Sequence, residues 1–260
     1  MSPRRSFEKR FDEYREAIAC LPPRDRLRKE DLLTDHFIIA SEGELEIYYA
    51  PFDFVSPAAR LTVVGITPGW TQMELAFRQA RKDLAAGLDV ETVCRRAKEE
   101  ARFAGAMRRN LIAMLDDLRV PDALGVSSTS ELFAIGESGL RSCSVIRYPC
   151  FVGKTNYTGY SPPIFKSPLL ASFVDEILLD ELLAEVASLV VPLGKAVGEV
   201  LQVLIRRGVL DRDRCLLGFP HPSGANAHRV RQFRERRNKM ARLVRIWAAN
   251  SSCVRSSGPG

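Results

Sequence analysis

One histidine stands in a setting that suits chemistry. His221 lies between two prolines in the stretch GFPHPSGAN, which spans residues 218–226. The prolines fix φ on either side of the imidazole, and Gly224 allows a sharp bend or a close approach. An apolar run at 215–217 precedes the stretch and a basic helical pattern follows it, so the loop should leave the carboxyl end of a buried strand, where open α/β sheets bind ligands. The alternative is a proline-rich turn with an incidental histidine.

A second loop has the same setting. The run LTVVGI at 61–66 has the β-branched and apolar residues of a buried strand, and it leads through Thr67, Pro68 and Gly69 into a helical pattern. In this order, the sequences GITPG and HPSGAN resemble the two active-site motifs of the uracil-DNA glycosylase superfamily. The segment VVPLGKA at 190–196 resembles a third segment of that superfamily, so the resemblance covers residues 60–248.

The resemblance implies an α/β fold, a three-layer α/β/α sandwich with a short, mainly parallel four-stranded central sheet. We expect a helical and hairpin extension packed on the core at 1–55, the glycosylase-like domain at 56–250 and a disordered tail at 251–260. Apolar periodicity predicts the elements. Helices are expected at 6–20, 72–86, 90–118, 130–135, 175–187 and 195–206, strands at 143–152 and 189–193, a hairpin at 37–40 and 45–50, and a long polar and aromatic loop at 153–170.

The implied activity is that of a monofunctional DNA glycosylase, which flips out a base, excises it and leaves an abasic site. By the resemblance, His221 would donate a hydrogen bond to the base oxygen that gains negative charge, or it would only cap the loop. Thr67 stands where superfamily members carry an Asp, Asn or Glu that activates or orients water. A hydroxyl can position water but is a poor base near neutral pH, so the reaction would be almost wholly dissociative, or an acid such as Asp53 or Glu74 would take part.

A second departure concerns base recognition. Superfamily members commonly read uracil with an Asn near the second core strand, but residues 144–149 contain none, and the nearest candidate is Asn156. Together with Thr67, this favours a non-uracil pyrimidine, such as a hydroxymethylated or glucosylated cytosine of phage DNA, which would make the protein an antiviral defence factor. The remaining residues expected to bind the substrate are Gly65, Ile66, Pro68, Gly69, Trp70, Phe77, Arg147, Tyr148, Tyr157 and Ser223. The aromatic ones among them are candidate stacking faces, or they pack in the core or in loops.

The expected DNA contacts follow the second motif and the basic pattern behind it. Residues 228–246 carry eight Arg or Lys against one acid, Glu235, so this face would follow a DNA backbone, or would simply be solvated. Ala225 is too small to fill the gap that a flipped base leaves. The residues expected to contact DNA are Lys195, Gly224, Ala225, Asn226, His228, Arg229 and Arg231.

Length and composition indicate the class of protein. With 46% apolar and 27% charged residues and a net charge of +6, the 260-residue chain is typical of globular proteins, and its length fits either one domain or two. The six cysteines form no CxxC pair, and GxxxxGK[ST] is absent, so we expect no metal, no cofactor and no nucleoside triphosphate site. No apolar run reaches ~18 residues and no secretory signal is evident, so we expect a cytoplasmic monomer that does not enter membranes.

Two further functions stay open. The chain could be a uracil-excising repair glycosylase, or a catalytically inactive DNA-binding module that keeps the fold and the basic surface. Thr67 is the residue that favours the inactive module. A doubly wound nucleotide-binding enzyme is disfavoured, because no GxGxxG follows any expected strand.

Overall fold

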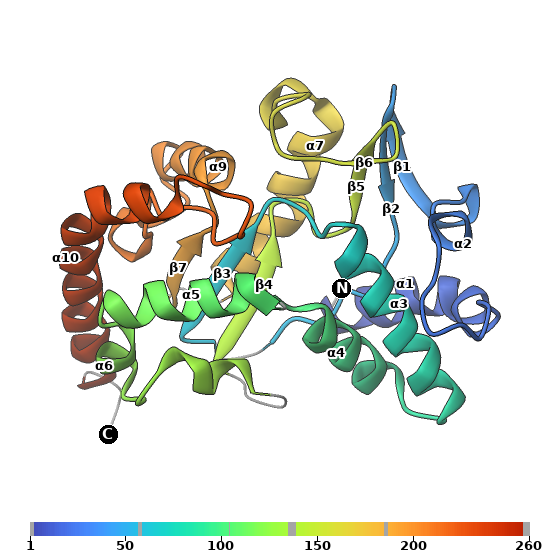
Figure 1. Ribbon diagram of the computed structural model, residues 1–260, viewed down its shortest axis with the longest axis horizontal. Helices are drawn as coiled ribbons and strands as arrows, with labels where there is room; N and C mark the ends of the chain where they lie inside the picture. Colours follow the sequence, from blue (N-terminus) through green and yellow to red (C-terminus); the bar gives the residue numbers. More distant parts are fainter. Residues whose placement is uncertain (1–2, 57–58, 104, 135–138, 185–186, 257–260) are drawn as a thin grey trace. The chain divides into compact units, whose positions relative to one another are not determined.

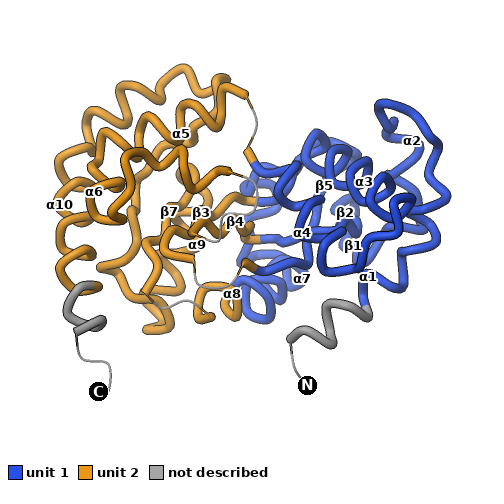
Figure 2. The backbone as a smooth tube through the Cα atoms, turned by 90° about the horizontal axis from the view of Figure 1, so that it is seen from below, with its two compact units in different colours: residues 1–55, 67–102, 146–178 blue, residues 56–66, 103–145, 179–260 orange. Residues whose placement is uncertain are grey.

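The computed structural model describes residues 3–56, 59–103, 105–134, 139–184 and 187–256. The chain forms two compact units, shown in blue and orange in Figure 2. Unit 1 comprises residues 1–55, 67–102 and 146–178, and unit 2 comprises residues 56–66, 103–145 and 179–260. The expected extension at 1–55 is therefore one part of unit 1, together with two later segments. No helix in the described ranges is both long and apolar enough to span a membrane.

Unit 2 is built on a parallel sheet. Its strands are β3 (Leu61–Gly65), β4 (Leu140–Ser144) and β7 (Leu189–Pro192), with β3 in the middle (Figure 1). The expectation of a four-stranded parallel sheet was wrong, because in the described ranges this sheet has three strands and the run at 215–217 is joined to it by one isolated parallel bridge, between Cys215 and Val190. The chain turns at Gly218, whose φ is +94°, before a longer ladder can form.

The helices of unit 2 are α5 (Gly105–Asp117), α6 (Val120–Leu124), α8 (Leu179–Leu183), α9 (Lys195–Arg206) and α10 (Arg229–Ser256). Apolar side chains of α5, α6 and α10 share one core with the sheet. The expected bounds of α9 are confirmed. The core brings β3 and β7 together with α5 and α10, through residues such as Val63, Val191, Leu115 and Val244. Helix α10 continues to Ser256, past residue 251, where the sequence analysis placed the start of a disordered tail; residues 257–260 lie outside the described ranges.

Unit 1 contains a separate antiparallel sheet in the order β1-β2-β5-β6. Its strands are β1 (Ile38–Glu42), β2 (Leu45–Tyr48), β5 (Cys150–Val152) and β6 (Thr155–Asn156), which confirms the expected hairpin. The helices of this unit are α1 (Pro3–Ala19), α2 (Lys29–Leu32), α3 (Trp70–Ala85), α4 (Val90–Ala101) and α7 (Pro168–Phe173). Unit 1 is thus a mixed α/β unit with its own sheet.

Three expected elements are divided. The strand expected at 143–152 is two strands in two different sheets, β4 and β5, separated by a segment that contains Pro149, which has no N–H for a ladder. The helix expected at 90–118 breaks into α4 and α5, where Phe103 and Gly105 have positive φ of 32° and 57°. The helix expected at 175–187 is a π-helical turn at 174–178 followed by the short α8; residues 185–186 lie outside the described ranges.

Two shorter expectations are also revised. The loop expected at 153–170 contains β6, a 3-10 turn (Ile164–Lys166) and the start of α7. The short helix expected at 130–135 is a 3-10 helix (Thr129–Phe133), and residue 135 lies outside the described ranges.

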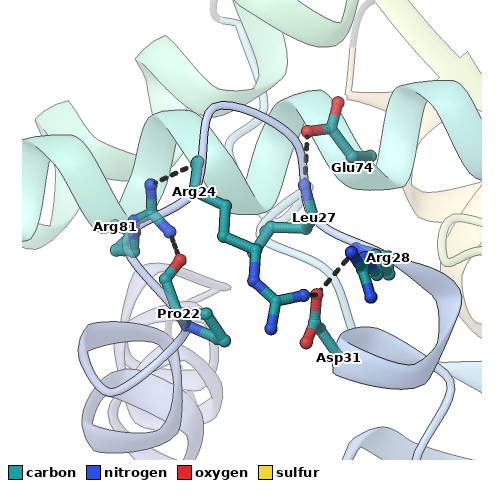
Figure 3. A network of polar contacts seen from close by, with 7 residues as sticks. All are labelled: Pro22, Arg24, Leu27, Arg28, Asp31, Glu74 and Arg81. Atoms are coloured by element: carbon teal, nitrogen blue, oxygen red, sulfur yellow. Dashed lines mark hydrogen bonds and ion pairs between the residues drawn. The ribbon is translucent and has the colours of Figure 1, made fainter.

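The connection between α1 and α2 is anchored on α3 by polar contacts (Figure 3). The guanidinium of Arg81 donates to the carbonyl oxygens of Pro22 and Arg24, and the Leu27 N–H donates to Glu74 Oε1 over 3.2 Å. These contacts satisfy main-chain groups of an irregular segment, so residues 20–28 are fixed without regular secondary structure.

Candidate active site

The GITPG motif is divided between the two units, whereas the HPSGAN motif lies in one of them. Gly65 and Ile66 end the β3 segment of unit 2, whereas Thr67, Pro68 and Gly69 begin a segment of unit 1 that enters α3. The whole HPSGAN loop belongs to unit 2, between the Cys215 bridge and α10.

The HPSGAN loop is held by side chains from two helices. From α5, Asn110 Nδ2 donates to the carbonyl of Pro222 over 2.8 Å, and from α10, Arg229 Nη1 donates to the carbonyl of Ser223 over 2.8 Å. Asn226 Nδ2 donates to the carbonyl of His221 over 3.2 Å. Three consecutive carbonyls of the loop therefore have side-chain donors, which fixes the backbone that carries the imidazole.

The same loop determines the tautomer of His221. The Ser223 N–H lies 3.2 Å from His221 Nδ1, and since a backbone N–H can only donate, Nδ1 must accept. The imidazole is then neutral with its proton on Nε2, which is a hydrogen-bond donor. Burial lowers the pKa of His221 below its usual value of 6.5, because the charged form loses solvation. The geometry and the pKa both favour a neutral donor at neutral pH.

The residue just before α9 has to be a glycine because it lies beside this histidine. Gly194 has a φ of +90°, and a Cβ atom there would lie 3.2 Å from the Cβ of His221. The Gly194 N–H also donates to the carbonyl of Phe219 over 3.1 Å. The VVPLGKA segment thus packs directly against the HPSGAN loop.

The side chain of Thr67 has a structural role in unit 1, because it bonds to two main-chain groups. Its hydroxyl donates to the carbonyl of Tyr148 over 2.8 Å and accepts the Cys150 N–H over 3.0 Å. These two bonds join the GITPG loop to the start of β5. The only hydroxyl proton of Thr67 is used, so a water molecule could bind to it only by donating to the second lone pair.

The rest of the first motif is tied to Asn156. The Trp70 N–H, in the first turn of α3, donates to Asn156 Oδ1 over 3.0 Å, and a Cβ at Gly69 would lie 3.3 Å from Asn156 Nδ2. The oxygen of Asn156, expected to face a base, instead accepts a bond from a helix terminus, while its Nδ2 group has capacity left. Pro68 is buried and Gly65 and Ile66 are half-buried.

Three of the four aromatic candidates are buried. Phe77 is fully buried and meets Phe37 edge-on with ring centroids 4.9 Å apart, while Tyr148 and Tyr157 are 2% and 3% exposed. The Tyr157 hydroxyl donates to the carbonyl of Pro162 over 2.5 Å. These three rings pack the interior of unit 1, which leaves Trp70, half-buried, as the candidate for stacking.

A buried carboxyl lies at the centre of a tyrosine pair. Asp53 is 4% exposed and accepts hydrogen bonds from the hydroxyls of Tyr49, over 3.0 Å, and Tyr148. Burial raises the pKa of Asp53 above 3.8, although both hydroxyls and the charge of half-buried Arg147 oppose that rise. The other candidate acid, Glu74, is also largely buried; it accepts from Leu27 and pairs with Arg78 over 3.0 Å.

The residues expected to contact DNA divide by exposure. Lys195, Gly224, Ala225, His228 and Arg231 are exposed, whereas Asn226 and Arg229 are half-buried and engaged in holding the loop. Arg231 lies 3.9 Å from Glu235. Helix α10 packs in the core through Met240, Val244 and Trp247, which are buried, whereas Val230 in its first turn is 61% exposed.

Sequence reasoning missed two contributors. Asn110 supports the HPSGAN loop from α5, and its only sequence signal is a polar residue just before the apolar row that begins at Leu111. Tyr49 completes the site around Asp53, and it looks like an ordinary strand aromatic in the sequence. Within the described ranges, no group of three or more His, Cys, Asp or Glu side chains could hold a metal ion.

Comparison with known proteins gives a family but no activity. The chain is 42% identical over 239 residues to the uncharacterized protein YoxB of Bacillus subtilis (strain 168), covering 91% of this chain and 93% of YoxB. The protein therefore belongs to the same family as YoxB. No family model matches the sequence, and no solved structure matches it.

Proposed function

We propose that this protein is a monofunctional DNA glycosylase that hydrolyses the N-glycosidic bond of a flipped-out base and leaves an abasic site. The observation that supports this proposal best is the neutral His221, whose Nε2 proton is fixed by the Ser223 N–H at Nδ1. The departing base of such a reaction gains negative charge, and a rigid neutral donor stabilises that charge without giving up a proton.

The energetics fit the role. A single preorganised donor to a developing oxyanion contributes ~3 kcal/mol, or two to three orders of magnitude in rate. Preorganisation here comes from Asn110, Arg229 and Asn226, which fix the carbonyls of residues 221–223. The donor need not reorganise when charge develops, which is the condition for a large rate effect.

The second proposal is that the substrate is a modified pyrimidine rather than uracil. Thr67 uses its proton on Tyr148, and Asn156 Oδ1 accepts from Trp70, so the residues that stand nearest to the superfamily's water-activating and uracil-reading groups are occupied. A hydroxymethylated or glucosylated cytosine, as in phage DNA, is the class we favour. The protein would then act in the cytoplasm as a monomer against foreign DNA.

Two other functions compete with this one. A uracil-excising repair enzyme needs the same His221 donor, and an inactive DNA-binding module needs only the basic surface. Thr67 supports the inactive module, since it carries no charge to stabilise an oxocarbenium ion. The rigid, neutral His221 favours an active enzyme over that module, because DNA binding alone does not need a fixed, half-buried neutral donor.

The test is an excision assay on a panel of oligonucleotides. Each carries one cytosine, uracil, hydroxymethylcytosine or glucosylated hydroxymethylcytosine, in single-stranded and duplex form, and abasic sites are revealed by alkaline strand cleavage. We expect cleavage at a modified cytosine and none at uracil. Cleavage at uracil alone would establish the repair enzyme, and DNA binding without cleavage of any member would establish the inactive module.

A further inference from the structure

A strongly basic cavity lies beside the HPSGAN loop in unit 2. It has a volume of about 610 Å³ and is bounded by α9, by residues 217–218 and by α10. Of the residues that the structure describes, five cationic side chains and a single acid line it. They are Lys195, Arg206, Arg212, Arg236 and Lys239, and the acid is Glu199.

The charges are poorly neutralised from within the protein. Glu199 lies 3.6 Å from Lys195, and both of these side chains are exposed. In the described part of the chain, neither Arg206 nor Lys239 has an acidic partner. Like charges gathered in one cavity repel each other unless an anion enters, so the cavity is suited to a ligand with several negative charges.

Its lining identifies the chemistry of that ligand. Among the described residues, no aromatic side chain lines the cavity, and the apolar ones that do are Ile205 and Leu217, so these residues offer no face on which a base could stack. It extends along α9 from Lys195 to Arg206, a span of about 16 Å at the rise of an α-helix, which is long enough for more than one phosphate. The positive end of the α9 dipole, at Gly194 and Lys195, adds to the attraction.

Two of these arginines are held in position by hydrogen bonds to main-chain carbonyls. Arg236 Nη1 donates to the carbonyl of Gly218 over 3.1 Å, and Arg212 Nη1 donates to the carbonyl of Cys215 over 3.1 Å. A guanidinium has five N–H donors, so each arginine keeps donors for a phosphate while one of them fixes its position. The cavity is therefore partly preorganised, unlike a face of freely moving lysines.

We propose that this cavity binds consecutive backbone phosphates of the DNA strand, so that the strand runs along α9 rather than along the outer face of α10. The inference rests on the proposed function, because it takes DNA as the ligand. Contacts to Arg231 and Arg237 on α10 are less available, since these side chains lie near Glu235 and Asp117.

The test compares two variants with equal loss of charge. The cavity variant combines Arg206→Gln with Lys239→Gln, and the control combines Arg242→Gln with Arg245→Gln, two exposed residues of α10 that do not line the cavity. The dissociation constant for duplex DNA is measured at several salt concentrations. Loss of two phosphate contacts lowers the slope of log Kd against log salt by about 1.8, and we expect this for the cavity variant and little change for the control.

The outcomes separate this inference from the proposed function. If the natural protein excises bases but the cavity variant keeps the full salt dependence of log Kd, the cavity does not bind the DNA strand, and the proposed glycosylase activity is retained. If no base is excised but the salt dependence falls only in the cavity variant, the cavity binds DNA and the proposed glycosylase activity is wrong. If the protein binds tripolyphosphate through these residues but does not bind DNA, the ligand is a free polyphosphate and the inference is wrong. Unfolding temperatures of both variants check that each is folded.

Discussion

The backbone N–H of Ser223 donates to Nδ1 of His221 over 3.2 Å and thereby places the imidazole proton on Nε2. A histidine that is charged at neutral pH could not accept this bond, because both of its nitrogens would be donors. The loop sequence and the ionisation state of its histidine are thus parts of one arrangement.

Replacing His221 with Ala should lower the rate constant for excision by two to three orders of magnitude, ~3 kcal/mol, while the affinity for DNA changes little. The imidazole acts on charge that develops only in the transition state. Single-turnover kinetics and DNA binding are measured side by side. His36→Ala, which removes an exposed imidazole in unit 1 that belongs to neither motif, is the matched control and should keep full activity. An active His221→Ala protein would contradict the proposed function.

The pH dependence of excision should reflect the lowered pKa of His221. The neutral form is the active one, so activity should stay constant as the pH falls to 6.5 and decline only below it. The stability of the fold should depend on pH in the same direction as the activity. The folded state resists protonation, so stabilisation from this group is present above pH 6.5 and is lost as the pH falls through its lowered pKa. A pH–rate profile tests the first expectation, and NMR titration of the imidazole tests the second. An inflection above 6.5 would be inconsistent with a half-buried neutral donor whose pKa is lowered.

Thr67→Val should destabilise the protein by about 1–3 kcal/mol, because the Cys150 N–H and the Tyr148 carbonyl lose their shared partner. Thr67→Ser keeps the hydroxyl and should recover most of that loss. Denaturant unfolding of the two variants measures the difference. Equal stability of the Val and Ser variants would show that the hydroxyl bonds are unimportant.

Thr67→Asn should give no gain on uracil and should lower activity on the natural substrate. The amide would have to replace both bonds of the hydroxyl, and it adds bulk to a loop that is already tied to Asn156 through the Trp70 N–H. Excision is measured on single-stranded and duplex uracil DNA at one salt concentration. A large increase on uracil would instead indicate a weakened uracil glycosylase.

Asp53→Asn should change how stability depends on pH. The folded pKa of Asp53 is raised by burial, so the folded state holds its proton more tightly than the unfolded chain does. Stabilisation from this group is fully present below pH 3.8, the unfolded value, and is lost as the pH rises through the raised pKa. An asparagine at position 53 does not titrate, so the stability of the variant relative to the natural protein should improve as the pH rises from 3.8 through the raised pKa of Asp53. Unfolding free energies from pH 3.5 to 7 provide the check, and a constant difference would contradict the prediction.

The sequence by itself determined the local elements whose signals are local. The parallel strands β3 and β7, the hairpin of β1 and β2, and helix α9 follow from apolar periodicity and from glycines next to buried runs. The stiff setting of His221 also follows, since two prolines fix φ on either side of it. Family membership required comparison with YoxB, because motifs of four or five residues are too short to assign a chain to a family.

Tertiary structure decided what each polar group does. Whether Thr67 holds water or a strand, whether Tyr148 stacks on a base or binds Asp53, and which nitrogen of His221 carries the proton all depend on partners distant in sequence or on loop geometry. Strand pairing also lay beyond the sequence. β4 and β5 read as one run, yet they belong to two sheets, because Pro149 and the competing partners β2 and β3 divide it. Periodicity reports which face of a segment is apolar, while hydrogen-bond partners are chosen only when the chain is packed.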